Sequence, residues 1–388
     1  MTLQRPGQGT SSGSRATLRG RPELHTDYAA DQAILDTKAK RVWTLAIVVL
    51  AVVAPFLLDR DVQQLLTRVS IYAIGGIGLN LVTGYAGQVS LGHAFFLGLG
   101  AYTAAFFGGV PTGNVRGLEL DVLVWLPMAG LVPMVVGLLV APLAARVRGL
   151  YLAILTLGLV FVGEHVWREA RTFTGGPGVG RRAPLPQLLG FDLHARHTIL
   201  GVDLDRETSF YLFCLLLLVV LGVLARNLAR SKMGRAFAAV RDRDIAAEIM
   251  GVPLLETKVL AFGVSSFYAG IAGGLYTVLL GQITPENWGL LVSIDFLAVI
   301  LIGGVATITG SIIGAAFVVV LPRIVQGVAP SIPFISGGVG EGGLITVFQL
   351  QTMLYGGLIV AFLVLEPRGM FGLWLRVRNY WKAWPFSY

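Results

Sequence analysis

Three polar side chains, Gln88, Ser90 and His93, lie in the middle of a long stretch of the sequence without charged residues. This stretch covers residues 69–115, which include no Asp, Glu, Lys or Arg. A helix beginning between Gln88 and Ser90 would turn its positive N-terminal end toward a carboxylate. No nucleophile, base and orienting group converge at usable spacing anywhere in the chain, so these groups indicate solute binding and not bond making.

The uncharged stretch must fold back on itself. As one helix it would be ~70 Å long, more than twice a hydrocarbon core of ~30 Å. Its middle is the glycine-rich string Gly84-Tyr-Ala-Gly-Gln-Val-Ser-Leu-Gly-His93. A non-helical break at membrane depth is tolerated only where protein or a water-filled cavity satisfies the backbone. We therefore predict a break that lines a transport path, with Gln88, Ser90, His93 and Tyr102 beside it. A hydrogen-bonded histidine that only packs helices would give the same pattern at His93.

The composition is that of a multispan membrane protein. Of 388 residues, 55% are hydrophobic and 13% charged, against about 25% charged in soluble domains. The mean hydropathy is +0.73. Two of the uncharged stretches are long enough for two passes, so we expect an all-α protein with about ten transmembrane segments. The stretches cover residues 43–58, 69–115, 122–145, 149–163, 208–225, 259–280, 296–322 and 342–365.

Basic residues predict the orientation. Counted by alternate loops, 20 of the 30 Lys and Arg residues, including every lysine, fall on one side. The positive-inside rule makes that side cytoplasmic and places both termini there, which requires an even number of crossings. Residues 1–41 are polar and rich in Gly, Ser and Arg, so we expect a disordered cytoplasmic tail. Residues 42–375 would then form the membrane domain, and residues 376–388 a cytoplasmic C-terminal tail.

The basic segment 230–253 lies between two membrane segments on the predicted cytoplasmic side. Asp242 or Asp244 can cap a short helix, Gly251 can take a left-handed end conformation, and Pro253 prevents continuation. Such a helix suits docking to a soluble partner. From spacing alone, a solvated loop helix whose charges set topology fits equally well. The residues we expect to dock are Arg235, Arg241, Asp242, Asp244, Glu248 and Gly251.

Two parts of the chain suggest an internal repeat. Each has a long uncharged run that Gly and small polar residues break, one at 87–92 and the other at 303–311. Paired breaks of this kind are typical of transporter repeats. Glycine is also common in membrane helices, and the chain has 50 glycines, so chance matches are an alternative.

Other candidate sites have simpler explanations. Cys214 is the only cysteine, which excludes disulfides and cysteine-based metal sites. The glycines at 304–311 lack the Gly-Lys-Ser/Thr ending of a phosphate-binding loop, so we expect no ATP hydrolysis by this chain. Glu164 and His165 are adjacent and cannot share a helix face. We expect Asp295 to cap a helix, and six tryptophans to anchor span ends at the membrane interface: Trp125, Trp167, Trp288, Trp374, Trp381 and Trp384.

Five ordered motifs carry a family resemblance. The string from Gly84 to Thr103 closely resembles the signature of the M-type permease of branched-chain amino acid ABC transporters, the LivM family. Residues 148–157 resemble that family's fifth span, and Thr174-Gly-Gly its periplasmic loop. Gly234-Arg-Ala-Phe-Ala-Ala-Val-Arg-Asp242 resembles its coupling segment, and Leu354-Tyr-Gly-Gly with Pro367-Arg-Gly its closing span. The resemblance covers residues 42–375.

The resemblance implies a pore subunit of an importer in the bacterial inner membrane. Its partners would be a homologous H-type permease, two cytoplasmic ATPases that use ATP and Mg, and an extracytoplasmic substrate-binding protein. Residues 235–251 would present the coupling helix to the ATPase, and no cofactor would be bound by this chain. The tail 1–41 and the loop Gly175-Gly-Pro-Gly-Val-Gly-Arg-Arg182 depart from the usual family pattern. The second departure leaves the contact with the binding protein open.

Two alternatives are left open by the residues. The first keeps the ABC architecture with another small cargo, such as urea, short amides or small carboxylates. The residues Gly87-Gln-Val before Ser-Leu-Gly-His favour amino acids. The second is an ion-coupled secondary transporter, which would need central ionisable residues, and the spans are almost free of them.

Overall fold

The computed structural model describes residues 38–111, 115–147, 149–193, 195, 197–199, 202–328, 335–336, 345–366 and 368–383. The predicted tail 1–41 lies outside this part except for its last four residues, which begin the first helix. The last five residues of the predicted C-terminal tail also lie outside it. Residues 376–383 belong to the helix α14 (Gly369–Ala383).

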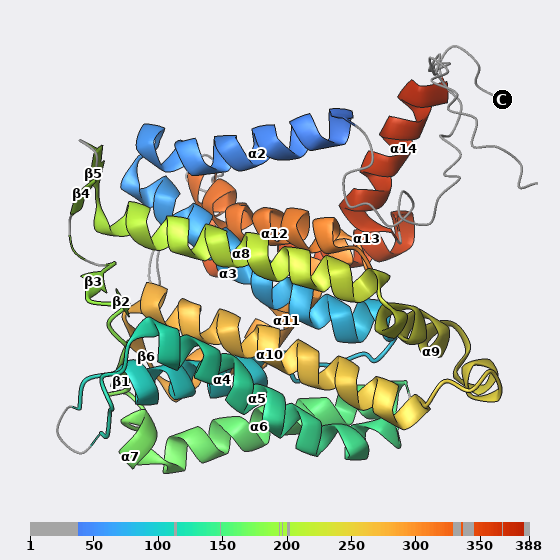
Figure 1. The fold of residues 1–388 in the computed structure, drawn as a ribbon, viewed down its shortest axis with the longest axis horizontal. Coiled ribbons are helices and arrows are strands. Elements are labelled where there is room, and N and C mark those ends of the chain that lie inside the picture. The colour runs from blue at the N-terminus through green and yellow to red at the C-terminus, as the bar shows by residue number, and fades with distance from the viewer. Residues whose placement is uncertain are drawn as a thin grey trace, which may run out of the picture.

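The described residues form a bundle of ten apolar helices, as expected for an all-α membrane protein (Figure 1). Seven are long and apolar enough to cross a membrane, counting η1 (Leu81–Tyr85) with α3 and η2 (Pro285–Trp288) with α11. Three are shorter, so the count of about ten segments fits. The helices are α2 (Lys38–Leu57), α3 (Arg60–Asn80), α4 (His93–Gly108), α5 (Val122–Ala145), α6 (Leu150–Glu169), α8 (Arg206–Arg230), α10 (Leu254–Leu280), α11 (Leu290–Gly303), α12 (Ile308–Val328) and α13 (Val347–Leu365).

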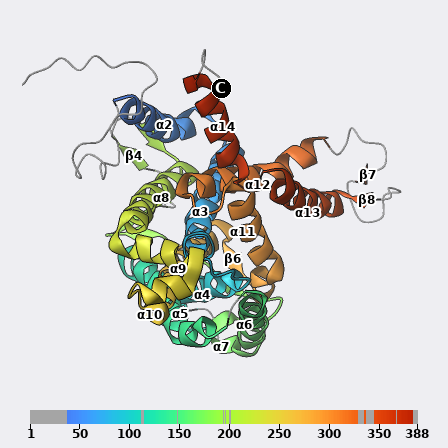
Figure 2. The same cartoon turned by 90° about the vertical axis from the view of Figure 1, so that its right-hand side faces the viewer.

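Two helices form the centre of the bundle. The most apolar windows of Arg60–Tyr85 and Leu254–Leu280 are each 72% buried, whereas no other span exceeds 44%. α3 packs against α8, α10 and α12, and α10 packs against α4 and α5. Small residues allow this close approach: a Cβ on Gly100 of α4 would lie 2.3 Å from the carbonyl oxygen of Gly270 on α10. Viewed along the bundle, α12 and α13 project to one side of this centre (Figure 2).

The first uncharged run folds back as predicted. α3 continues into the π-helix η1, residues 86–92 are non-helical, and α4 then begins at His93. The expected helix start between Gln88 and Ser90 is therefore wrong by a few residues, because this part of the chain is non-helical and Gly87 takes a left-handed conformation. The run at 296–322 also holds two helices, α11 and α12, separated by residues 304–307.

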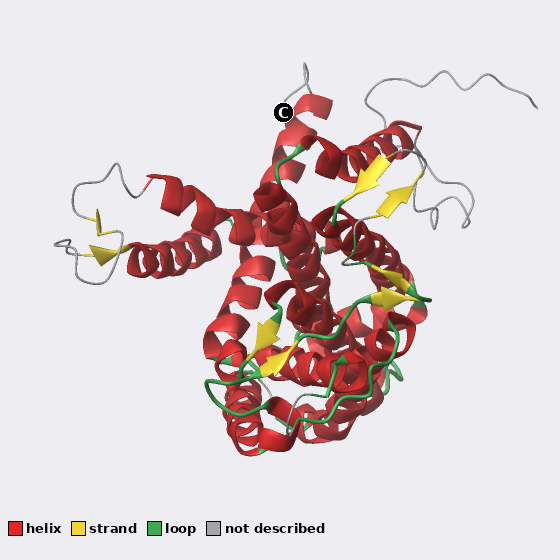
Figure 3. Ribbon diagram, turned by 90° about the vertical axis from the view of Figure 1, so that its left-hand side faces the viewer, coloured by secondary structure: helices red, strands yellow, loops and turns green. Residues whose placement is uncertain are grey.

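The strands β1 to β6 lie at the end of the bundle opposite α9 (Lys232–Ile249), whereas β7 and β8 lie apart, beyond α12 and α13 (Figures 1, 2 and 3). β1 pairs antiparallel with β6, so that Arg181 lies opposite Ile283. β2 pairs with β3, β4 with β5, and β7 with β8. The strands are β1 (Arg181–Arg182), β2 (Gln187–Leu188), β3 (Phe191–Asp192), β4 (His197–Ile199), β5 (Val202–Leu204), β6 (Gln282–Ile283), β7 (Ile335–Ser336) and β8 (Ile345–Thr346). The four-residue helix α7 (Arg171–Thr174) lies at the same end (Figure 1).

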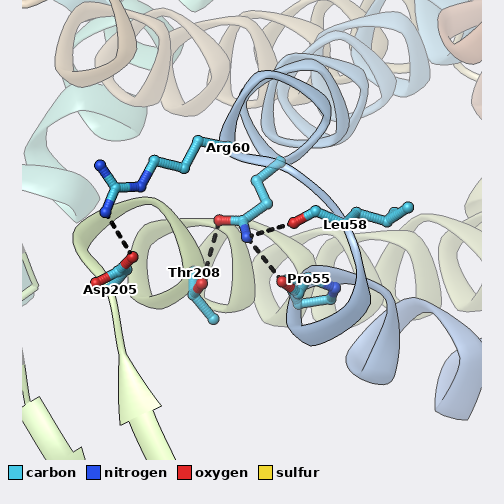
Figure 4. A network of polar contacts seen from close by, with 6 residues as sticks. Pro55, Leu58, Arg60, Asp205 and Thr208 are labelled. Carbon is cyan, nitrogen blue, oxygen red and sulfur yellow. Dashed lines mark hydrogen bonds and ion pairs between the residues drawn. The ribbon is translucent and has the colours of Figure 1, made fainter.

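A polar network at this end joins α2, α3 and α8 (Figure 4). The buried amide of Gln63 donates to the carbonyl oxygens of Pro55 at 2.7 Å and Leu58 at 3.0 Å. The amide oxygen of Gln63 accepts a hydrogen bond from Thr208 at 3.1 Å. Arg60 pairs with Asp205 at 3.0 Å beside it. Because Gln63 satisfies carbonyls left free at the end of α2, it fixes the angle at which the chain enters α3.

Two expectations about single residues are wrong. Trp125, Trp167 and Trp288 do not anchor span ends in the membrane interface, because they are at most 4% exposed and pack inside the protein. Asp295 does not cap a helix, since it lies five residues inside α11. Trp374 on α14 is 57% exposed. The side chain of Trp381 and the whole of Trp384 lie outside the described residues.

Candidate functional site

The predicted coupling segment and the predicted break are in direct contact. Arg241 on α9 donates from Nη1 to the carbonyl oxygen of Gly84 at 3.1 Å. Gly87 has φ +69 and lies against Arg241 so closely that a Cβ there would be 2.7 Å from its Cγ. Glycine adopts such a left-handed conformation without steric cost. The sequence therefore folds with glycines where the backbone of the break must meet α9.

A cavity of about 230 Å³ lies between the break and α9. The turn between α5 and α6, with Val147 and Gly149, forms another part of its wall. The cavity brings together residues from both predicted sets: Gln88 from the transport path, and Arg241, Asp242 and Asp244 from the docking segment. Sequence reasoning did not connect these sets.

Local hydrogen bonds hold the non-helical chain before α4. The amide of Gln88 donates to the carbonyl oxygen of Lys258 at 3.3 Å, and the hydroxyl of Ser90 accepts from Gly92 N–H at 3.3 Å. Thr156 on α6 accepts from Leu91 N–H, and Ser293 on α11 accepts from Ala94 N–H, both at 2.9 Å. Two neighbouring helices thus satisfy backbone donors at the start of α4.

Asn80, at the end of α3, joins the first break to the second. Its side chain is fully buried. Nδ2 donates to Thr307 O at 2.9 Å and to Ser311 Oγ at 2.8 Å, while Oδ1 accepts from Ala306 N–H at 2.8 Å. Gly84 permits this approach, because a Cβ there would lie 1.9 Å from Oδ1 of Asn80. A contiguous set of contacts therefore runs from Arg241 through the π-helix to residues 304–311.

α9 consists of two parts. Arg243 has non-helical angles, φ −155 and ψ 98, so the helix kinks there. The expected cap at Asp242 or Asp244 is wrong, because Ser231 caps α9 and accepts from the N–H groups of Met233 and Gly234. Asp244 accepts from the N–H of the adjacent Ile245 at 2.9 Å, and Asp242 pairs with Arg241 at 3.0 Å. Gly251 has φ +84, which confirms the expected left-handed end. The second part exposes three apolar side chains: Ile245 is 63%, Ile249 81% and Met250 84% exposed.

Comparison with known proteins decides the family. A family model described as the branched-chain amino acid transport system / permease component matches residues 62–377. The chain belongs to this permease family. The LivM high-affinity branched-chain amino acid permeases of Salmonella typhimurium and Escherichia coli K12 are each 31% identical to the permease over 349 residues, 86% of this chain and 75% of theirs. An LsrC autoinducer 2 import permease from an Enterobacter strain is 29% identical over 209 residues, 53% of this chain and 54% of its own. No solved structure matches the permease.

The permease does not gather all four predicted path residues in one place. Gln88 borders the cavity beside α9, whereas Tyr102 lies ~13 Å further along α4 than His93. The His93 ring is 4.9 Å from that of Phe296, and the Tyr102 ring is 5.7 Å from that of Trp167. His93 Nε2 and the Tyr102 hydroxyl are both enclosed without a hydrogen-bond partner among the described residues.

The remaining predicted docking residues of the permease lie on α9. Arg235 is in its first part and donates to the carbonyl oxygen of Arg230 at 3.2 Å. Glu248 is in the exposed second part. In the described part of the chain, no three His, Cys, Asp or Glu side chains gather closely enough to hold a metal ion.

Sequence reasoning missed four polar residues of this site: Asn80, Thr156, Lys258 and Ser293. The sequence could have indicated the role of Asn80, because it is the only Asn between residues 69 and 113, in a stretch without charged residues. A buried amide needs partners, so its presence in an apolar helix points to a specific contact. Thr156 and Ser293 had no such signal, because single hydroxyls in membrane helices often bond only to their own backbone.

Proposed function

We propose that this chain is the membrane-spanning permease subunit of an ABC importer that carries branched-chain or other hydrophobic amino acids across the bacterial inner membrane. The observation that carries the proposal is the position of α9. It lies at the end of the apolar bundle, Arg241 bonds it to the break, and its second part presents Ile245, Ile249 and Met250 to the surroundings. The names of its LivM relatives support the cargo.

In the proposed mechanism, two separate ATPase subunits bind ATP and Mg and close on each other. Their movement displaces the second part of α9, and Arg241 passes the displacement to Gly84 and Gly87. Asn80 then links this movement to residues 304–311 on the other side of α3. Alternating access would follow when both breaks shift together and the path opens to one side or the other.

The proposal includes further partners and an orientation. A homologous H-type permease would complete the pore, and an extracytoplasmic binding protein would deliver the solute at the strand-bearing end. α9, both termini and every lysine would be cytoplasmic. Substrate would pass Gln88 and Ser90, while His93 and Tyr102 would contribute the two unpartnered polar groups along α4.

Reconstitution tests the cargo. The chain, its partner permease, the two ATPases and the binding protein are placed in proteoliposomes, and uptake of labelled leucine is measured with and without ATP. We expect uptake that depends on ATP and on the binding protein and that unlabelled isoleucine or valine reduces. If labelled leucine is not taken up but urea or a short amide is imported in the same proteoliposomes, the ABC architecture stands and the cargo is different.

The docking role of α9 has its own test. In the double variant Ile245→Ser and Ile249→Ser, we expect the ATPases to be lost on purification while the partner permease is retained. The matched control is Val377→Ser with Tyr380→Ser, which removes two exposed apolar side chains from α14 instead. Full import by the chain without ATPases would rule out the ABC mechanism.

A further inference from the structure

The cavity beside α9 has the composition of a site for a small zwitterion. Its volume is about 230 Å³. One part of its wall is apolar and includes Ala86, Ala144 and Leu152. The other part carries charges of both signs, with Arg241, Asp242, Arg243, Asp244 and Lys258. A wall of this kind offers places for a carboxylate, an ammonium and an apolar side chain at once.

Two of the cations are available to an incoming carboxylate. Arg241 already pairs with Asp242 and bonds to Gly84. In contrast, the side chains of Arg243 and Lys258 form no ion pair or hydrogen bond with the described residues, although both line the cavity. Guanidinium and ammonium groups form charge-assisted hydrogen bonds to carboxylates.

Gln88 supplies an acceptor beside Lys258 in the wall of the cavity. Its side chain is 5% exposed, so it is held in place. Its amide nitrogen donates to Lys258 O at 3.3 Å, and its amide oxygen accepts no hydrogen bond from the described residues. Gln88 is among the residues that line the cavity. An ammonium group is a suitable donor for its amide oxygen.

The kink at Arg243 separates this cavity from the proposed docking surface. Residues 240–244 line the cavity, whereas the exposed apolar residues begin at Ile245. A partner seated on Ile245, Ile249 and Met250 therefore uses a different part of α9. Solute in the cavity would contact the same Arg241–Gly84 region that links α9 to the break.

We propose that this cavity binds the amino acid on the α9 side of the break, with its carboxylate between Arg243 and Lys258 and its ammonium at the amide oxygen of Gln88. The inference rests on the proposed function and adds a regulatory consequence. An amino acid that accumulates on the α9 side rebinds there and holds α9 and the break together. Import then slows as the internal concentration rises, because the occupied cavity opposes their relative movement.

The experiment measures initial rates of ATP-driven uptake of labelled leucine into proteoliposomes that contain the complete transporter. The interior is preloaded with unlabelled leucine, with leucinamide, which has no carboxylate, or with inorganic phosphate. We expect internal leucine to lower the initial rate about tenfold at about ten times its dissociation constant. Leucinamide and phosphate, at the same concentration, should leave the rate unchanged.

The variant pair is Arg243→Gln with Lys258→Gln, and the matched control is Arg378→Gln, which removes an exposed charge from α14. The quantity compared is the ratio of rates with and without internal leucine, so a change in the basal rate does not disturb the test. We expect the ratio to approach one in the double variant and to stay low in the control. In the double variant, binding of labelled leucine to the transporter in nanodiscs without the binding protein should also fall. This measurement of binding does not depend on transport activity.

Three results would overturn the inference. If the transporter imports leucine but internal leucine has no effect, the cavity is not a rebinding site and the proposed function still stands. If internal phosphate or leucinamide lowers the uptake rate as much as internal leucine does, the cavity does not recognise the carboxylate of an amino acid. Unchanged inhibition in the double variant would place the internal site elsewhere. Absence of ATP-driven amino acid uptake would instead overturn the proposed function itself.

Discussion

Arg241 donates a hydrogen bond from Nη1 to the carbonyl oxygen of Gly84 at 3.1 Å, although 157 residues separate them in the sequence. The carbonyl lies within η1, the π-helix that ends α3. π-Helical turns inside α-helices are frequent at functional sites. A charged donor from α9 therefore stabilises the point at which the central helix stops being regular.

Replacing Arg241 with Gln should uncouple ATP hydrolysis from transport. The variant loses the guanidinium bond to Gly84, and a hydrogen bond to a charged group contributes about 1.5–3 kcal/mol. We expect leucine uptake to fall about tenfold or more, while the ATPases stay bound. Uptake and ATPase activity of the reconstituted complex are measured together.

The control for this variant is Arg378→Gln, which changes the net charge equally on α14. It should leave the ratio of leucine imported to ATP hydrolysed at the value of the unmodified complex. If Arg241→Gln also leaves that ratio unchanged, the contact with Gly84 is not part of the coupling.

Replacing Gly87 with Ala should be harmful for two reasons. Its φ of +69 disfavours a side chain, and the new Cβ would be 2.7 Å from Cγ and 3.1 Å from Cα of Arg241. Left-handed geometry alone costs about 1–2 kcal/mol for a non-glycine residue. We expect lower thermal stability and a large loss of uptake.

Gly222→Ala is the matched substitution. Gly222 lies inside α8, and a Cβ added there would have no other atom within 4 Å, so Ala should be neutral or slightly stabilising. Thermal unfolding in detergent, followed by fluorescence, compares the two. Equal midpoints for both variants would contradict the close packing of the break on α9.

Replacing Asn80 with Leu should remove the hydrogen bonds that connect the end of α3 to residues 304–311 and should lower the stability of the protein. The amide N–H of Ala306 loses its acceptor, whereas Thr307 O and Ser311 Oγ lose a donor but stay bonded to each other. Each buried polar group left unpaired costs about 1–3 kcal/mol. We expect a clear drop in the unfolding midpoint, whereas Asn227→Leu, at an exposed position on α8, should change it little.

Replacing Arg181 with Lys should loosen the strand-bearing end. Arg181 is 4% exposed and donates to the carbonyl oxygens of Phe173 and Arg116. Burial lowers the pKa of its guanidinium to about 10, so it remains charged at neutral pH. A single ammonium cannot span two carbonyls as a guanidinium fork does. We expect faster proteolysis of the 171–205 loop, and no such effect for Arg182→Lys, the exposed neighbour.

The positions of the membrane segments could be predicted from the sequence, because a long apolar stretch without charged residues is what the hydrocarbon core of a membrane requires. The break at residues 86–92 and the end at Gly251 could be predicted as well, since glycine at these points has a conformational meaning. Tryptophan near a span end was misleading, because the same residue suits a lipid interface or a tight protein core. Trp288 is enclosed beside Tyr276, with ring centroids 6.1 Å apart.

The candidate site was less accessible to sequence reasoning. Gln88 and Lys258 are 170 positions apart, and only the packing of α3, α4 and α10 brings them together. Asn80 and Ser311 are 231 positions apart, and the packing of α3 against α12 brings them together. Hydrophobic patterns fix which face of a helix is buried, but they do not fix which buried polar groups meet.

The length of α10 and its lack of proline connect the two ends of the bundle mechanically. Its 27 residues contain no proline, whereas α5, which packs along it, contains three. It ends beside the β1–β6 pair at one extremity and begins just after Gly251 at the other, a length of ~40 Å. Proline is one of the main causes of sharp helix kinks, so α10 lacks a cause of bending that α5 has three times. A protein that presses on the strand-bearing surface would therefore act on the base of α9 and on the first break together, because Gln88 bonds to Lys258 near the start of α10.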